Sequence, residues 1–85
     1  MQTTMSTPWG TAQSAEELAP GVFFISTASH GGLQVFPNAE NYPEAARIAR
    51  SSTYSFMRGT VAWLEEDCDA GRYLRTLDQA EEAGQ

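Results

Sequence analysis

The sequence predicts an α+β fold, a small antiparallel sheet of two to three strands packed by one short and one longer helix. Three observations predict it. Residues 22–27 and 33–36 are short runs of mainly β-branched, aromatic and other apolar residues, and a glycine pair lies between them, which is typical of a hairpin at about 22–36. Residues 43–50 are rich in alanine and begin with proline. Residues at about 60–79 place apolar side chains at helical spacing.

The predicted hairpin forms the centre of the sheet. Both alternating faces of 22–27 are apolar, as expected of a central strand that is covered on each side. Gly31 and Gly32 would supply the positive φ angles of a tight reversal before the return strand. Residues 11–18 are predicted to add an edge strand, and a short helix is the alternative there because alanine, glutamate and leucine are good helix formers.

Two helices are predicted after the hairpin. Pro43 stands at the first position of the helix at about 43–50, where its missing N–H costs nothing. Thr60 is the expected N-cap of the longer helix, which runs to about residue 79. Wrapped on that helix, Asp67 falls between two apolar stripes, so we expect its carboxylate to be buried and to accept hydrogen bonds.

Length limits the chain to one domain. A second hydrophobic core would need roughly another 50 residues beyond the 85 present. We therefore expect one domain over 1–85, with flexible ends at 1–6 and 81–85. The N-terminus lacks the basic region and apolar run of a signal peptide, and no apolar stretch approaches the ~20 residues that cross a bilayer. The sequence thus predicts a cytoplasmic protein that does not bind membranes.

The charge of the chain favours a protein partner over nucleic acid. Eleven acidic residues face five arginines, which gives a net charge of −6. This charge repels a phosphate backbone, so we expect no direct nucleic-acid binding, and it suits a partner with a basic surface. Exposed acids, three of them on the solvated face of the predicted long helix, and aromatic residues in connecting segments would make that contact. These candidates are Glu65, Glu66, Asp69, Glu16, Glu17, Tyr42 and Tyr54.

No residue set typical of an enzyme, a cofactor site or a metal site is present in the sequence. His30, the only histidine, lies beside serine and glycine residues, and a zinc site centred on it would lack the usual ligand spacing. Cys68, the only cysteine, falls on an apolar stripe of the predicted long helix, where a free cysteine packs as a small buried side chain. Its acidic neighbours disfavour a reactive thiolate.

Four motifs occur one after another along most of the chain. They are Pro8-Trp9-Gly10-x-Ala12-Gln13, Ala19-Pro20-Gly21-Val22, Ser26-Thr27-Ala28-Ser29-His30-Gly31-Gly32 and Trp63-Leu64-Glu65-Glu66-Asp67-Cys68-Asp69. Together they resemble a family of small bacterial, plasmid and phage proteins that is catalogued only as a domain of unknown function. The resemblance covers roughly residues 7–78 and departs from the pattern at Leu64, where an aromatic is expected.

The resemblance implies an origin on a mobile genetic element, and it marks signature positions that we interpret as residues that hold the fold. These are Trp9, His30, Gly31, Gly32, Asp67 and Cys68. Small acidic proteins of this kind are similar in character to anti-CRISPR proteins, which inhibit RNA-guided immune complexes, often by occupying a basic surface that binds DNA.

We therefore expect a non-enzymatic inhibitor or adaptor that binds a protein. Its most concrete form is an anti-CRISPR protein that binds a subunit of a host CRISPR effector complex and blocks DNA binding. Two alternatives stay open. One is a structural accessory module whose signature residues simply hold the fold, and the other is a hydrolase or metal-binding protein centred on His30.

Overall fold

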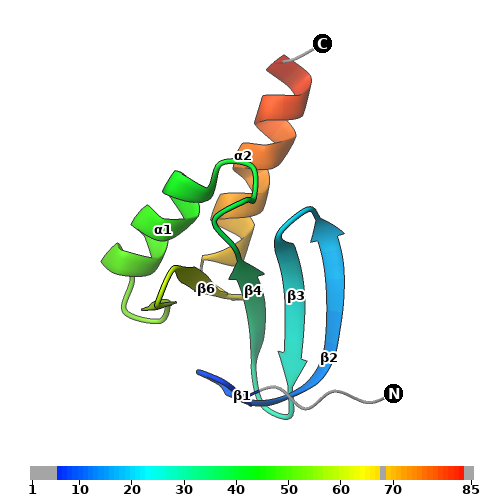
Figure 1. Ribbon diagram of the computed structural model, residues 1–85, viewed down its shortest axis with the longest axis vertical. Helices are drawn as coiled ribbons and strands as arrows, with labels where there is room; N and C mark the ends of the chain where they lie inside the picture. The colour runs from blue at the N-terminus through cyan, green and yellow to red at the C-terminus, as the bar shows by residue number, and fades with distance from the viewer. Residues whose placement is uncertain (1–5, 68, 84–85) are drawn as a thin grey trace.

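The computed structural model describes residues 6–67 and 69–83. These residues form a six-stranded sheet and two helices (Figure 1). In chain order the elements are β1 (Ser6–Thr7), β2 (Gly10–Ala19), β3 (Val22–Thr27), β4 (Gly31–Val35), α1 (Tyr42–Ser51), β5 (Phe56–Arg58), β6 (Val61–Glu65) and α2 (Ala70–Ala83).

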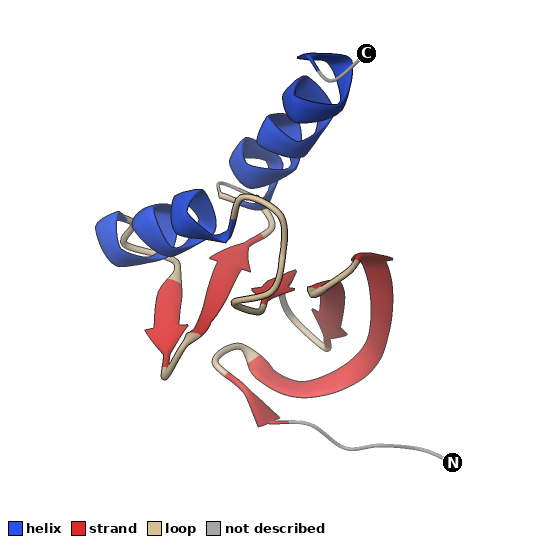
Figure 2. Cartoon of the chain, turned by 45° about the horizontal axis from the view of Figure 1, so that its top comes forward, coloured by secondary structure: helices blue, strands red, loops and turns tan. Residues whose placement is uncertain are grey.

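The sheet is entirely antiparallel and curls into a half-barrel (Figure 2). Its strand order is β1-β2-β3-β4-β6-β5, so β6 inserts between β4 and the edge strand β5 after the chain has passed through α1. The curl brings the two edges of the sheet toward each other. Arg58 on β5 donates a hydrogen bond of 3.2 Å from its Nη1 to the backbone oxygen of Ser6 on β1.

One face of the sheet holds the main hydrophobic core. Directly opposed residues of an antiparallel pair share a face, and the register aligns Phe24 with Leu33 and Leu33 with Leu64. Leu33 and Leu64 are fully buried, together with Ile48 of α1 and Tyr73 of α2. The two helices therefore cover this face. Burial raises the pKa of Tyr73 to about 12, with a smaller contribution from the charge of Glu40.

The opposite face carries Trp9, which lies in the turn between β1 and β2. The ring of Trp9 packs edge-on against Trp63 of β6, with centroids 5.7 Å apart and planes at 79°. The ring of Trp9 needs a neighbour without a side chain. A Cβ placed on Gly32 would lie 2.5 Å from the ring of Trp9 and 2.2 Å from the backbone oxygen of Leu64. Glycine at position 32 thus lets the indole lie directly on the sheet.

Parts of the predicted fold are confirmed. Residues 22–27 pair antiparallel with 31–35 as the expected hairpin, and the segment expected as an edge strand pairs with β3 as β2. The short helix is present as α1, with Pro43 in its first turn. However, the predicted sheet of two to three strands is wrong, because six strands form a curled half-barrel.

The predicted long helix at about 60–79 is wrong in its first half. Residues 61–65 are strand β6, and the helix begins at Ala70. The run Val61-Ala-Trp-Leu64 is apolar at every position, so it lacks the periodicity that separates a buried strand from a helix. Gly59, with φ at 62°, turns the chain from β5 into β6, so Thr60 lies in that turn and is not an N-cap.

The expected role of the glycine pair in the hairpin is also wrong. Gly31 and Gly32 lie inside β4, and neither has a positive φ. The reversal is made by hydrogen bonds to Thr27 instead. Its N–H donates to the backbone oxygen of His30 at 2.8 Å, and its Oγ1 accepts from the His30 N–H at 3.1 Å.

Within the described residues, neither helix is long and apolar enough to cross a membrane.

Candidate functional site

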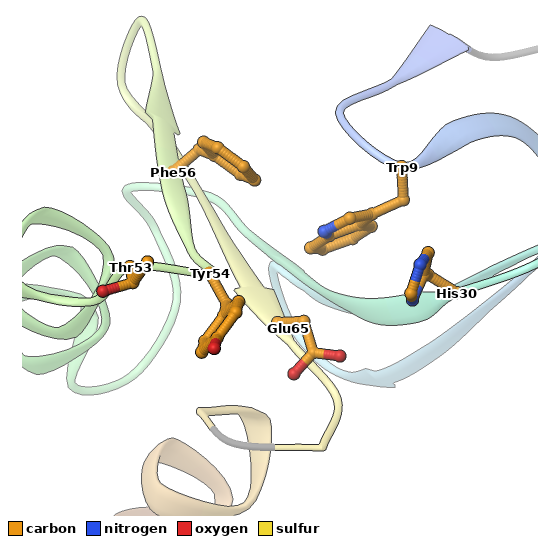
Figure 3. Close-up of a pocket in the computed structure, with 6 residues that line it drawn as sticks. All are labelled: Trp9, His30, Thr53, Tyr54, Phe56 and Glu65. Carbon is orange, nitrogen blue, oxygen red and sulfur yellow. The ribbon is translucent and has the colours of Figure 1, made fainter.

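A hollow opens on the face of the sheet that carries Trp9 (Figure 3). It consists of two cavities of about 190 and 280 Å³ that share the lining residues His30, Tyr54 and Glu65. We call this combined hollow the groove. Its remaining lining residues are Trp9, Thr53, Phe56 and Asp67. The groove thus lies between the β3–β4 turn, the α1–β5 connection and the end of β6.

Three aromatic rings form the apolar wall of the groove. Phe56 on β5 is directly opposed to Trp63, so it lies on the face that carries Trp9. Tyr54 and Phe56 are 60% and 42% exposed, so two large aromatic side chains that line the same hollow are open to solvent. Figure 3 shows these two rings and Trp9 arranged around a common opening. Their free surface is therefore available to a ligand.

A carboxylate closes the other side of the groove. Glu65 is opposed to Gly32 and is only 8% exposed. Its Oε1 accepts a hydrogen bond of 2.9 Å from the backbone N–H of Asp67, an exposed residue that also lines the groove. No arginine is among the lining residues. Arg58 lies on the same face of β5 as Phe56 but does not line either cavity. Its guanidinium is 5.8 Å from the ring centroid of Trp63, and its Nη1 donates to the backbone oxygen of Ser6.

Asp69 fixes the segment that carries Thr53 and Tyr54. The residue is almost fully buried at 2% exposure, and its Oδ2 accepts hydrogen bonds from the hydroxyls of Ser52 and Ser55. The Ser52 hydroxyl in turn accepts the N–H of Tyr54 at 3.1 Å. Asp69 therefore acts as a positioning residue for the aromatic wall, although it does not line the groove.

The same network reaches the acidic side of the groove. Ser55 Oγ, which donates to Asp69, also accepts the backbone N–H of Glu65 at 3.2 Å. The strand residue that carries the groove carboxylate and the loop that carries the aromatic ring are thus tied to one buried carboxylate. Such a connected network holds both walls of the groove in a fixed relative position.

The structure separates the residues that the sequence grouped as partner contacts. Tyr54 and Glu65 line the groove, whereas Glu16, Glu17 and Glu66 are exposed elsewhere. The side chains of the other two make hydrogen bonds within the chain. The Tyr42 hydroxyl donates to the Thr60 carbonyl, and the Asp69 carboxylate accepts from Ser52 and Ser55. The expectation that Glu65 and Asp69 are exposed on one helix face is wrong, because residues 61–65 form a strand.

The signature residues also differ from expectation. Asp67 is exposed, so the prediction that its carboxylate is buried is wrong, and the buried carboxylate is two positions later at Asp69. His30 is exposed and lines both cavities. Cys68, expected to pack in the core, lies outside the described residues. Within residues 6–67 and 69–83, no three histidine, cysteine or acidic side chains are placed to hold a metal ion.

Sequence reasoning missed Phe56 and Thr53, and it assigned Trp9 only a role in the fold. A usable signal was present for the aromatic wall. Tyr54 and Phe56 are two positions apart, which is the spacing that puts side chains on one face of an extended chain. The contribution of Trp9 carried no such signal, since the ring reaches Gly32 across a long separation in the sequence.

Comparison with known proteins gives a family and no activity. A family model described as "Domain of unknown function (DUF7007)" matches residues 2–83. No curated protein matches the chain, and no solved structure matches it. The groove itself is therefore the basis for assigning a function.

Proposed function

The chain belongs to the DUF7007 family, and on the geometry of its groove we propose that it is a non-catalytic protein-binding module. The groove takes a cationic side chain, arginine or lysine, from the surface of a partner protein. The observation that carries this proposal is the combination in one hollow of three aromatic rings with the nearly buried carboxylate of Glu65.

The chemistry of the two walls fits a basic side chain. An aromatic face attracts a cation through its quadrupole and also covers the apolar stem of arginine or lysine. A carboxylate at the end of such a channel forms a charge-assisted hydrogen bond to the cationic head. Trp9, Tyr54 and Phe56 supply the faces, and Glu65 supplies the carboxylate, with Asp67 beside it at the opening.

The charge of the whole chain supports the same partner. A net charge of −6 attracts a basic surface over long range and raises the rate of encounter. Exposed charge pairs are individually weak, so most of the affinity must come from a desolvated anchor. The groove provides that anchor, because it offers apolar rings and a carboxylate that is already withdrawn from water.

The most specific form of the proposal is an inhibitor of a CRISPR effector complex. Such a complex holds its DNA in a positively charged channel, whose arginine and lysine side chains are the ligands that an acidic, aromatic groove selects. Binding there would exclude the DNA backbone. Two supports for this form are the acidic charge of the chain and its resemblance to proteins from mobile elements.

The general proposal is tested with small ligands. We would titrate ¹⁵N-labelled protein with N-acetylarginine amide and with N-acetylcitrulline amide, which has nearly the same shape and no charge. The arginine derivative should shift the indole N–H of Trp9 and the amides of Tyr54 and Glu65, and the citrulline derivative should not. Equal shifts with both, or shifts confined to other residues, would contradict the proposal.

Variants sharpen this experiment. Glu65→Gln keeps the shape of the side chain and removes its charge, and it should weaken arginine binding about tenfold or more. Tyr54→Ala should remove binding by deleting one ring. Glu40→Gln is the matched control, because Glu40 is an exposed acid that does not line the groove. If Glu40→Gln weakened binding as much as Glu65→Gln, only net charge would matter.

The CRISPR form needs a separate assay. Purified protein would be added to CRISPR effector complexes of several types, and binding of a matching DNA duplex would be measured by gel mobility shift. Inhibition by the wild-type chain and by Glu40→Gln, with loss of inhibition in Tyr54→Ala, would support it. Inhibition of none of the complexes would overturn this form, and the arginine titration would still decide the general proposal.

A further inference from the structure

The outer edge of β2 offers a second binding surface, away from the groove. β2 pairs with β3 from Ala12 to Ala19, but β1 pairs only with Gly10 and Thr11. Among the described residues, no strand covers the remaining outer edge of β2. Residues 13–18 are exposed on both faces of the strand, and Leu18 has 44% of its surface exposed. Such an edge presents unpaired backbone groups that can accept another strand.

The register shows which backbone groups face outward. Backbone bonds alternate from side to side along an antiparallel strand. Thr27 donates its N–H to His30, and Phe36 donates to Gly21, so the odd-numbered residues of β3 bond to β4 and its even-numbered residues bond to β2. Ala15 and Glu17 are opposed to Ile25 and Phe23, which are odd. The N–H and C=O groups of Ala15 and Glu17 therefore point away from the sheet.

The side chains on this edge select a charge pattern. Glu16 is opposed to Phe24 and Glu17 to Phe23, so the two carboxylates lie on opposite faces of the sheet. Successive residues of any strand also alternate between faces. Two consecutive basic residues of an added strand would thus meet one acid each, whereas basic residues two positions apart would share one face and reach only one acid.

We propose that the outer edge of β2 binds an extended segment of a partner protein as an added strand, with two consecutive basic residues facing Glu16 and Glu17. Irregularities in register at Ala12/Ser14 and at Glu17/Ala19 limit the regular stretch to Ser14–Glu17, so the added strand is short. A second copy of this chain is a poorer occupant. A two-fold antiparallel pairing centred on Glu16 would place this carboxylate directly opposite its own copy.

Two synthetic peptides of identical composition test the charge pattern. The first is acetyl-Thr-Val-Lys-Arg-Val-Thr-amide, and the second is acetyl-Thr-Lys-Val-Arg-Val-Thr-amide, in which the cations are two positions apart. Calorimetric titration should show the first binding about fivefold more tightly, from one additional pairing of exposed charges together with better register. Glu16→Gln/Glu17→Gln should remove this difference. Equal affinity of the wild-type chain for both peptides would overturn the charge pattern.

Amide hydrogen exchange tests the added strand directly. With the first peptide at about ten times its dissociation constant, exchange at Ala15 and Glu17 should slow about tenfold, while the amide of Glu16, already bonded to β3, should not change. Protection of Ala15 and Glu17 without peptide would overturn the proposal. It would mean that another segment of the chain, or a second copy detected by ultracentrifugation, already covers this edge.

A proline variant and N-methylated peptides complete the test. Ala15→Pro removes an outward N–H, which an edge strand tolerates, so the fold should persist and peptide binding should fall about tenfold or more. If that variant unfolds, two N-methylated peptides replace it, one methylated at its odd-numbered and one at its even-numbered residues. Only the peptide whose methyl groups block the N–H groups that face β2 should fail to bind the wild-type chain. Tyr54→Ala should bind the peptide normally, so this proposal and the groove proposal can fail separately.

Discussion

The two faces of the sheet differ in what covers them. On one face, Leu33 and Leu64 are sealed beneath both helices, in a cluster of apolar residues around Tyr73. On the other face, Trp9 covers Gly32 and Trp63, and the cover ends at the groove. Gly32 and Leu33, which are adjacent in β4, thus lie on opposite faces of the sheet. The comparison indicates that one face supplies most of the stability, while the other carries the groove with its exposed aromatic rings.

The largest effect is expected on the helix-covered face. Leu33→Ala removes a fully buried side chain from the main core, and the loss of burial together with the cavity should lower the free energy of unfolding by about 3 kcal/mol. For a domain of this size the midpoint temperature should fall by roughly 12–24 °C. Leu18→Ala, at an exposed leucine, is the control and should change stability by less than about 0.5 kcal/mol. Similar losses in both would contradict the division of the two faces.

A slightly smaller loss is expected one residue away on the other face. Gly32→Ala adds a methyl group where the backbone of Leu64 and the ring of Trp9 leave no room, so it should cost about 2–3 kcal/mol and displace the indole. Urea unfolding measures the cost, and tryptophan fluorescence reports the displacement. Gly71→Ala in α2 meets only a contact at 3.6 Å and should be neutral or stabilising by up to about 1 kcal/mol. A neutral Gly32→Ala would show that Trp9 does not lie on the sheet.

Asp69 ties the two walls of the groove through Ser52 and Ser55, and its removal should affect both stability and binding. Asp69→Ala leaves the hydroxyls of Ser52 and Ser55 without their acceptor and should cost about 2 kcal/mol. Because this residue positions the loop of Tyr54, affinity for N-acetylarginine amide should also fall at temperatures where the variant is still folded. The control is Asp67→Ala, whose exposed side chain should contribute less than about 0.5 kcal/mol. Equal costs in the two variants would contradict the buried network.

Alkaline pH should weaken the helix-covered face through Tyr73. Its pKa is about 12 in the folded chain and 10 as the reference value, so the unfolded chain loses this proton first as the pH rises. The stabilisation is complete below pH 10 and declines between pH 10 and 12, by an amount on the order of 2 kcal/mol. Urea unfolding across this range should show the decline. Tyr73→Phe cannot ionise and should lose less stability over the same interval, and an unchanged decline would place its cause elsewhere.

The sequence was informative where the pairing is local. The hairpin of β3 and β4 joins two runs separated by a short turn, and both runs are rich in strand-forming residues, so pattern and proximity agree. The opposite holds for β6. Its residues pair with β4 across the whole of α1, and the apolar run Val61-Ala-Trp-Leu64 fits either a buried strand or a helix. Only the tertiary pairing decides between them.

The wrong assignment of residues 61–65 to a helix also led to wrong positions for the acidic candidate residues. Counting Asp67 and Asp69 along a continuous helix put the first on the apolar side and the second in solvent. In the structure 61–65 is a strand and the helix begins at Ala70, so Asp69 directly precedes the helix. Its carboxylate accepts hydrogen bonds from Ser52 and Ser55, and no local sequence pattern connects these serines to it. Tyr54 and Glu65 were both among the candidates, but the sequence contained no signal that they share a groove.

The smallest effect on stability is also the most informative for function. The side chain of Tyr54 is 60% exposed, and its backbone is held by Ser52, so Tyr54→Ala should change the free energy of unfolding by less than about 0.5 kcal/mol. The same variant should no longer bind N-acetylarginine amide. The substitution removes from the groove a ring proposed to contact this ligand, and it leaves the rest of the fold nearly unchanged. Thermal unfolding and the titration, made on one sample, give both values. A loss of more than about 1 kcal/mol would mean that Tyr54 supports the fold, and the two faces would then not divide stability from binding. Unchanged affinity in a stable Tyr54→Ala would instead leave the division of stability intact and remove the groove as the site for a cation.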